Sequence, residues 1–435
     1  KYKNIKYLKL IAKKNLNIES SAGMLPILSF IQRIGITEAI LEAIGLKEGK
    51  SSKKQTNLIM LCILALIDGA TRIQQIPHFM QKNRYLCSLL GFNKLPEYTT
   101  IYKLLKRINK NNAFVNKMKD MMQEIIKKYY INDQEAIIAD IDATYMETNK
   151  ESGMLNYKNE KSISALLCNI GKEKIVWDFD LREGSNSPAY GISKIVNDFF
   201  TKTKDIKIQK LIRSDSAGYQ GEVINICERK GAYFVIKVSE HYDFDQLLKD
   251  KTYTKYEDEK DYIYVADLIH TMNNTNPFRV VGYTENYEGE LFSRSGYIAT
   301  NIGKEKTGYE IVKIYRKRAT QEQAIEELKN ESGFRYVPSK EKDINDIYGC
   351  LCILAYNIIV LMQYLMKSKG IKIDLELLDK RFRIKTFRYY FIHLAGKIVK
   401  RSRQIIVYIS EIESKWWEAL LSFWNSCFGF GFYYR

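Results

Sequence analysis

The order of predicted strands and helices between residues 135 and 238 constrains the fold more than any other feature of the sequence. Three apolar segments in succession have the composition of buried strands, and a helix, a strand, a second helix and a fifth strand follow them. The second helix ends at a glycine, which is a common helix terminator. The seven segments are EAIIADIDATYM, SISALLCNIG, KIVWDFDLREG, SPAYGISKIVNDFF, IQKLIRSDSAGY, QGEVINICERKG and AYFVIKVSE.

This succession is the order of a ribonuclease-H-like α/β core, in which three hairpin-linked strands precede two crossover strands. We predict that residues 134–240 form the first part of the core and residues 300–370 the second part. Residues 241–299 interrupt the two parts. Because this interruption is rich in tyrosine and in short alternating runs, it predicts a β-rich insertion subdomain.

The regions on either side of the core are predicted to be helical. Residues 1–133 are interpreted as a helical DNA-binding domain. Within them, a helix that starts after Pro96 carries Lys103, Lys106 and Arg107 on one side and apolar residues on the other. It resembles the second helix of a helix-turn-helix motif. The alternative is an ordinary basic amphipathic helix that does not contact DNA.

Residues 371–435 are predicted to form a C-terminal helical region with one apolar face. The residues with the helical spacing are Trp416, Trp417, Leu420, Leu421 and Trp424. A large apolar face in a soluble chain usually packs against another surface. Two interpretations follow: the face forms a contact between two protomers, or it packs on the core of its own chain.

The composition favours a cytoplasmic protein that binds a polyanion. Lysine and arginine number 68 against 51 acidic residues, a formal charge of +17 that is spread along the chain, although a simple compositional bias toward lysine is the alternative. Seven cysteines without a CxxC pair, and only four histidines, argue against a zinc site or a disulfide scaffold.

The apolar run Tyr348–Met366 contains Asn357 and Gln363, so we predict a buried core helix and no membrane partner.

Acidic residues in the predicted strands indicate where the chemistry takes place. Asp140 and Asp142 are two residues apart in the first strand, so both face the same side of the sheet. Acids in an apolar strand are costly unless they are paired or bind metal. Asp215 follows the fourth strand, which neighbours the first strand in this topology, so the sheet brings Asp142 and Asp215 together.

The stretch YRKRATQEQAIEELK, Tyr315 to Lys329, supplies a third carboxylate, Glu322. If the stretch is one helix, its tyrosine, Arg318, Glu322 and lysine form one polar stripe. Alternatively, a capping box of Thr320 with Gln323 begins the helix after Arg318, or Arg318 and Glu322 are an ordinary solvated pair. Three adjacent carboxylates repel one another unless a cation lies between them, and their oxygen atoms favour Mg²⁺ or Mn²⁺. Two such ions would activate an attacking hydroxyl and stabilise the departing oxygen.

These residues together carry a resemblance to a known family. The chain resembles the DDE transposases of bacterial insertion sequences in the group with the Y-x2-R-x3-E-x6-K signature. The signature residues here are Tyr315, Arg318, Glu322 and Lys329. DIDAT resembles the first-acid motif and RSDSAGY the second, so the resemblance implies catalytic, metal-binding roles for Asp142, Asp215 and Glu322. Asp140 is the alternative first ligand.

The resemblance also implies a function. It implies a cut-and-paste transposase that binds the terminal inverted repeats of its element, cleaves there, with or without a DNA hairpin, and joins 3′-hydroxyls to target DNA. Tyr315, Arg318 and Lys329 would hold phosphates, and the insertion would help to hold a flipped base. Trp177 and the aromatic residues of the insertion are candidates for stacking on that base, and core packing is the alternative for each of them. The expected partners are double-stranded DNA and a second protomer. The alternatives are a domesticated DNA-binding protein and a stand-alone metal-dependent nuclease.

Overall fold

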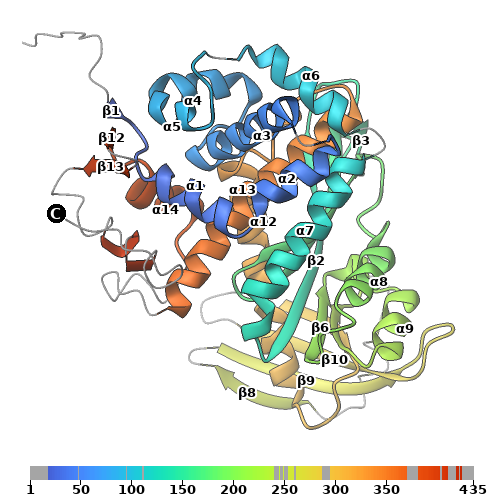
Figure 1. Ribbon diagram of the computed structural model, residues 1–435. Helices are drawn as coiled ribbons and strands as arrows, with labels where there is room; N and C mark the ends of the chain where they lie inside the picture. The colour runs from blue at the N-terminus through green and yellow to red at the C-terminus, as the bar shows by residue number, and fades with distance from the viewer. Residues whose placement is uncertain are drawn as a thin grey trace, which may run out of the picture.

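The structure is a computed structural model that describes residues 18–423 with several gaps. The segments outside the described residues are 48, 95, 110–111, 240–243, 245–247, 249–252, 259–260, 287–293, 370–380, 402–403, 410–417 and 421. A group of helices from the N-terminal third packs beside one large mixed sheet that carries helices of its own (Figure 1). The fold is therefore a mixed α/β fold, as the sequence predicted.

Five strands at one end of the large sheet lie in the order β5–β4–β2–β6–β7. β4 is antiparallel to both β2 and β5, whereas β6 is parallel to both β2 and β7. The strands are β2 Ala136–Glu147, β4 Lys161–Ile170, β5 Ile175–Glu183, β6 Gln209–Ser214 and β7 Tyr233–Lys237, and the connecting helices are α8 Ile192–Lys202 and α9 Gly221–Arg229. A two-residue strand, β3 Met154–Leu155, pairs with β4. Strands and helices follow one another as the sequence predicted.

The residues predicted to form an inserted subdomain extend this same sheet. Their strands are β8 Thr254–Asp258, β9 Asp261–His270, β10 Phe278–Asn286 and β11 Arg294–Thr300. β11 runs antiparallel to β7, with Ala299 opposite Ile236, so the sheet continues without interruption to ten strands. The insertion is therefore rich in β-strands, as the sequence predicted, and β11 covers the edge of β7 that would otherwise be free.

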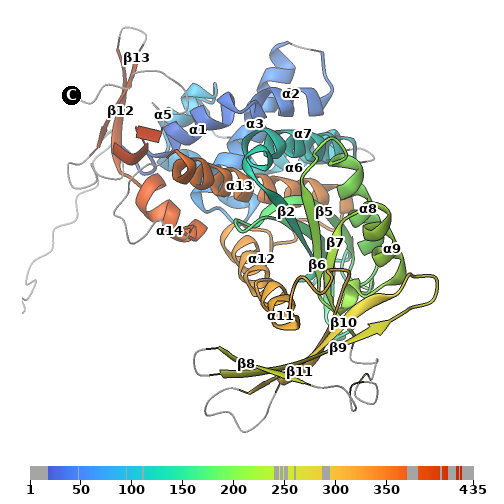
Figure 2. The same ribbon diagram turned by 90° about the horizontal axis from the view of Figure 1, so that it is seen from below.

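Helices cover both faces of the core sheet, with α8 and α9 on one face and α11 and α12 on the other (Figure 2). α11, Gly308–Arg316, packs on the inserted strands as well as on β7, where Ile311 and Val312 join a buried cluster with Val281. Arg316 at its end also forms an ion pair with Glu285 of β10 at 2.7 Å. The inserted strands therefore support the helix that leads to α12, Ala319–Glu331.

The N-terminal helices gather around one long apolar helix, α13 Lys342–Ser368. They are α1 Met24–Arg33, α2 Ile36–Ile44, α3 Lys50–Asp68, α4 Ile76–Lys82, α5 Arg84–Leu89, α6 Tyr98–Ile108 and α7 Ala113–Tyr129. By length and composition α13, and two bent helix pairs among the described residues, could cross a membrane. However, 94% of the apolar window of α13 is buried inside the protein, which agrees with the predicted core helix.

The C-terminal region contains strands that the sequence analysis missed. After α14, Ile384–Phe387, and a π-helical turn, β12 Gly396–Arg401 and β13 Gln404–Ile409 form a small sheet with β1, Ile18–Glu19. The predicted helical C-terminal region is thus partly a β-structure. Of the predicted apolar face, Leu420 is buried in the core, and nearby Phe423 packs on Phe30 of α1 at 6.0 Å. Trp416, Trp417, Leu421 and Trp424 lie outside the described residues.

Candidate active site

Two neighbouring strands bring the first two predicted acids together. Ile141 of β2 lies opposite Ser214 at the end of the parallel strand β6, so Asp142 and Asp215 follow at adjacent positions. Asp215 begins a short 3-10 turn, and its carboxylate accepts a hydrogen bond from the backbone N–H of Ala217 at 3.1 Å. The apolar residues of β2 bury the strand, and this burial fixes the position of its acids.

The stretch from Tyr315 to Lys329 is not one helix. α11 ends at Arg316 and α12 begins at Ala319, so the chain turns between them. The alternative prediction, that the helix begins after Arg318, is correct. It begins without the predicted capping box, because the Thr320 hydroxyl donates back to the carbonyl of Lys317 at 2.9 Å. Instead, the N–H of Arg318 donates to the carbonyl of Tyr315 at 2.8 Å, which keeps the turn tight.

The turn directs Arg318 into the site. One terminal nitrogen of Arg318 lies 2.7 Å from a carboxylate oxygen of Asp142, and the other lies 4.0 Å from Glu322. The Arg318 side chain is only 7% exposed, whereas that of Glu322 is 74% exposed. Asp142, Arg318 and Glu322 therefore lie next to one another, with the arginine between the two acids.

The pKa of Asp142 is raised by its burial and by the negative charges near it. Burial raises this pKa to about 6, the nearby Arg318 opposes the rise, and the charges of Asp215 and Glu322 add to it. The pKa of Tyr315 is also raised, first by burial and then by the same acids, while Arg318 lowers it. Asp215, Tyr315, Arg318 and Glu322 therefore all lie close enough to Asp142 to interact with it electrostatically.

Asp140, the alternative first ligand, is committed elsewhere. Its carboxylate is fully buried and accepts hydrogen bonds from Nε of Arg213 at 2.7 Å and from Nη2 at 2.9 Å. It also accepts from the ammonium of Lys174. With two cations on one carboxylate, Asp140 has the character of a buried structural ion pair.

The remaining predicted DNA-binding residues lie away from the acids. Lys329 is mostly buried two turns along α12, 3.8 Å from Glu326, and burial lowers its pKa. Lys103, Lys106 and Arg107 are exposed on α6, where Lys106 pairs with Glu341 at 2.7 Å. No interaction among the described residues joins these three α6 cations to the acids.

Of the two roles considered for Trp177, the structure has core packing. Its ring is buried and meets Phe199 of α8 edge-on at 6.0 Å, so it packs in the core. Among the aromatic residues of the inserted strands, Tyr256 stacks on Tyr309 of α11 at 4.8 Å. Tyr262 is exposed, and the ammonium of Lys255 lies over its ring.

The donor set suits a hard divalent cation in its chemistry. Asp142, Asp215 and Glu322 offer only carboxylate oxygens, the ligands that Mg²⁺ and Mn²⁺ prefer. In the described part of the chain, however, no group of three or more acidic, histidine or cysteine side chains is close enough to hold an ion as it stands. The reason is visible in the geometry: Arg318 provides the positive charge at Asp142, and Glu322 extends toward solvent.

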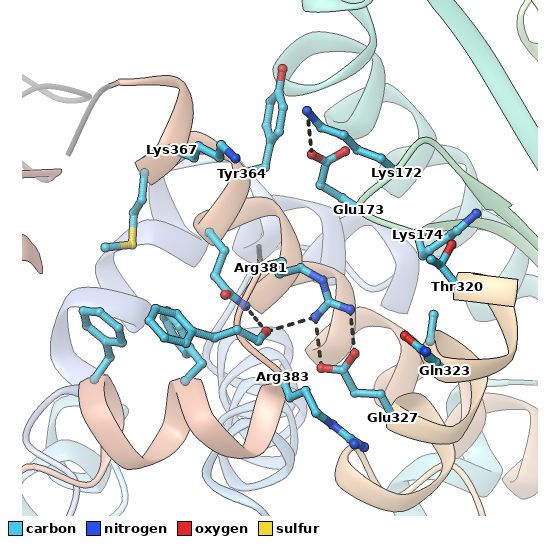
Figure 3. A pocket seen from close by; sticks show the side chains of 16 residues that line it. Lys172, Glu173, Lys174, Thr320, Gln323, Glu327, Tyr364, Lys367, Arg381 and Arg383 are labelled. Carbon is cyan, nitrogen blue, oxygen red and sulfur yellow. Dashed lines mark hydrogen bonds and ion pairs between the residues drawn. The ribbon is translucent and has the colours of Figure 1, made fainter. Parts of the chain in front are cut away.

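A cavity of about 390 Å³ is lined by Thr320, Gln323 and Glu327 of α12, and none of the three acids lines it (Figure 3). There Glu327 accepts two hydrogen bonds from Arg381, at 2.9 and 2.5 Å, and one from the N–H of Ile384. Lys174 and Thr320 approach the same cavity from the β4–β5 turn and from the first turn of α12. These contacts fix α12 against the C-terminal region.

Comparison with known proteins identifies the class. Residues 10–417 match the family described as transposase DDE domain group 1. Because the match covers most of the chain, the protein belongs to this family and is a DDE-type DNA transposase. The similar solved structures include a piggyBac transposase in a synaptic complex with hairpin DNA, at 12% identity and a TM-score of 0.47, covering 84% of this chain and 78% of the other. No curated protein matches.

Proposed function

We propose that the protein is a cut-and-paste transposase whose catalytic acids are Asp142, Asp215 and Glu322. The observation that carries the proposal is the placement of Asp142 between the charges of Asp215, Glu322 and Arg318. The strand order β5–β4–β2–β6–β7 supports a ribonuclease-H-like core around these acids. Such a core would cleave at the terminal inverted repeats and join the 3′-hydroxyls to target DNA.

The three acids would hold Mg²⁺ or Mn²⁺, two ions per site, which supply charge neutralisation and an activated oxygen nucleophile when bound. Arg318 would then leave Asp142 and bind a DNA phosphate through its planar fork. Its buried Nε has no hydrogen-bond partner among the described residues, which leaves a donor for that phosphate. Tyr315 and Lys329 would contact neighbouring phosphates of the same DNA end.

Other parts of the chain would bind and present the DNA. The N-terminal region, residues 1–133, would bind the element end, with Lys103, Lys106 and Arg107 on its exposed face. The formal charge of +17 supports extended phosphate contact. A cytoplasmic site of action is supported by the six described cysteines, which are free and buried.

The first experiment is a cleavage assay on DNA that carries the element's own end, with and without Mg²⁺. Glu322→Gln should abolish cleavage and retain end binding, because the amide keeps the shape but weakens metal ligation; Asp142→Asn and Asp215→Asn should behave alike. Glu326→Gln is the matched control on the same helix and should cleave normally. Cleavage by Glu322→Gln at the wild-type rate would remove the site assignment.

A joining assay separates the proposal from a stand-alone nuclease. Supplied with cleaved ends and a target plasmid, a transposase forms joined products, whereas a nuclease only hydrolyses DNA. Gel analysis of the plasmid therefore decides between them. Hydrolysis without joining, with all three acids intact, would favour the nuclease.

A further inference from the structure

Beneath the proposed acids lies a buried polar network that reaches both helices of the turn. At its centre, Asp140 of β2 binds Arg213 of β6 and Lys174 of the β4–β5 turn, as described above. All three side chains are buried. Buried charges are costly, so a site that carries three of them needs a close fit among the partners.

Arg213 extends the network to α11. Its Nη1 donates to the carbonyl of Ile314 at 2.7 Å, the residue just before Tyr315. The last carbonyls of a helix have no partner within the helix, so this bond satisfies one of them and fixes the end of α11. The planar fork of arginine makes the three contacts at once, which an ammonium group cannot do.

Asn169 extends the network to α12. It lies opposite Asp140 in the register of β4 and β2, and its amide donates to the carbonyl of Lys174 at 3.0 Å. Its side-chain oxygen accepts a hydrogen bond from Gln321 at 2.9 Å. Gln321 is fully buried in the first turn of α12 and immediately precedes Glu322.

We propose that this anchor network, defined as Asp140, Asn169, Lys174, Arg213 and Gln321, positions the α11–α12 turn for catalysis. It holds the chain on both sides of the turn, so that Arg318 and Glu322 face Asp142 and Asp215. The inference rests on the proposed function of those acids. Because a displacement of about 1 Å can cost roughly 100-fold in rate, a loosened anchor slows cleavage even when the fold survives.

The test is Arg213→Lys in the full-length protein. Lysine keeps a positive charge beside Asp140 but cannot also reach the carbonyl of Ile314. The single-turnover cleavage rate should fall at least about tenfold, while the affinity for end DNA should change less than about threefold. A rate that falls while binding persists distinguishes positioning from a general loss of folded protein.

Arg279→Lys is the matched control. Arg279 of β10 is also buried, pairs with Asp267 at 3.1 and 2.8 Å, and donates to the carbonyls of Gly303 and Lys306. It belongs to the inserted strands and contacts none of Asp142, Asp215 and Glu322. Its variant should lose melting temperature as Arg213→Lys does, but its cleavage rate should fall much less, because Arg279 holds the start of α11 and not the turn after it.

Gln321→Met is the second variant, for the case that Arg213→Lys does not fold. Methionine keeps the length, loses the bond to Asn169 and leaves no charge unpaired. Gln363→Met, at another buried glutamine, is its control. Gln321→Met should cleave at least about tenfold more slowly with end binding retained, and Gln363→Met should not.

Wild-type rates in both Arg213→Lys and Gln321→Met, or equal losses in variants and controls, would overturn the anchor proposal. Glu322→Gln in the same assay separates the two ideas. If Glu322→Gln is inactive while the anchor variants are fully active, only the anchor fails. If Glu322→Gln cleaves normally, the proposed acids themselves are wrong.

Discussion

Arg318 takes the place at Asp142 that a cation would need. Its guanidinium lies 2.7 Å from the carboxylate, and both groups are largely buried. The sequence pattern identified the residue and its partner Glu322, but it suggested a solvated pair or a phosphate contact. The ion pair with Asp142 depends on the turn between α11 and α12, which the sequence pattern offered only as an alternative to one continuous helix.

The first prediction at this scale concerns protons at Asp142. Burial raises the pKa of Asp142 to about 6, so below that pH the folded, metal-free protein holds a proton that metal binding must displace. The affinity for Mn²⁺ should therefore increase about tenfold per pH unit from pH 5 to 6 and level off above pH 7. Titration calorimetry measures this affinity, and a flat profile would contradict the raised pKa of Asp142.

The same shift has a defined sign for stability. The folded pKa of Asp142 is above the value near 3.9 of an unfolded aspartate, so the folded state binds the proton more tightly. This contribution to stability is fully present below about pH 4 and is lost as the pH rises through about 6. Urea unfolding of the wild type at several pH values measures this pH-dependent contribution, and Asp142→Asn should lack it.

A second prediction concerns Asp140. Asp140→Asn leaves the ammonium of Lys174 and the guanidinium of Arg213 buried without a counter-charge, so the free energy of unfolding should fall by about 3–5 kcal/mol. Urea unfolding measures the change. The control is Asp178→Asn, which removes a partner from only one cation, Lys119, and should cost less. Equal losses would mean that the two cations at Asp140 do not act together.

At the scale of elements, the core strands were predictable, and the helix break was predicted only as one of two alternatives. β2, β4 and β5 are rich in Ile, Val and Leu, and such short buried runs indicate strands. The break at Lys317 contains neither glycine nor proline, and tertiary bonds from Arg213 and Asp142 form it. One local signal was present and was missed: Thr307 and Glu310 form a capping box that begins α11.

The anchor residues were missed for a related reason. Arg213 lies in the apolar strand before Asp215, and Asp140 lies in the strand beside it. Two opposite charges in neighbouring buried strands predict a pair, because neither is stable alone. That inference needed the β2–β6 pairing, which the predicted topology already supplied. Gln321 and Asn169 carry no such signal, since a buried amide cannot be recognised from sequence spacing.

The packing of α11 gives a third prediction. Ile311 is buried between α11 and the inserted strands, so Ile311→Ala should lower the free energy of unfolding by about 2–5 kcal/mol. The control is Ile269→Ala on β9, whose side chain is 69% exposed, and its effect should stay within about 0.5 kcal/mol. Chemical denaturation compares them. Similar values for both variants would show that the inserted strands do not support α11.

At the scale of the whole molecule, one site per chain must serve an element with two ends. We therefore predict that the active species is a dimer assembled on DNA, with each protomer holding one end. Light scattering of the protein mixed with end DNA should report two chains per complex. A control with DNA of unrelated sequence should not yield this species. Concerted joining of both ends by a single chain would contradict the dimer.

The described C-terminal residues do not support the prediction that the apolar face of this region joins two protomers. Leu420 and Phe423 are buried against the chain's own core, so they support the intramolecular interpretation of that segment. The dimer prediction therefore rests on the number of DNA ends. The sequence could identify an apolar segment, but apolar spacing alone does not say which surface covers it.

The small sheet that joins β1 to β12 has a consequence for how the protein is made. Ile18 pairs with Lys397 and Glu19 with Gly396, so the first described strand finds its partner only near the other end of the chain. A ribosome delivers the N-terminus first, so this strand must wait until most of the protein has been synthesised. A message broken before that point yields chains that carry Asp142 and Asp215 yet cannot close β1 onto β12.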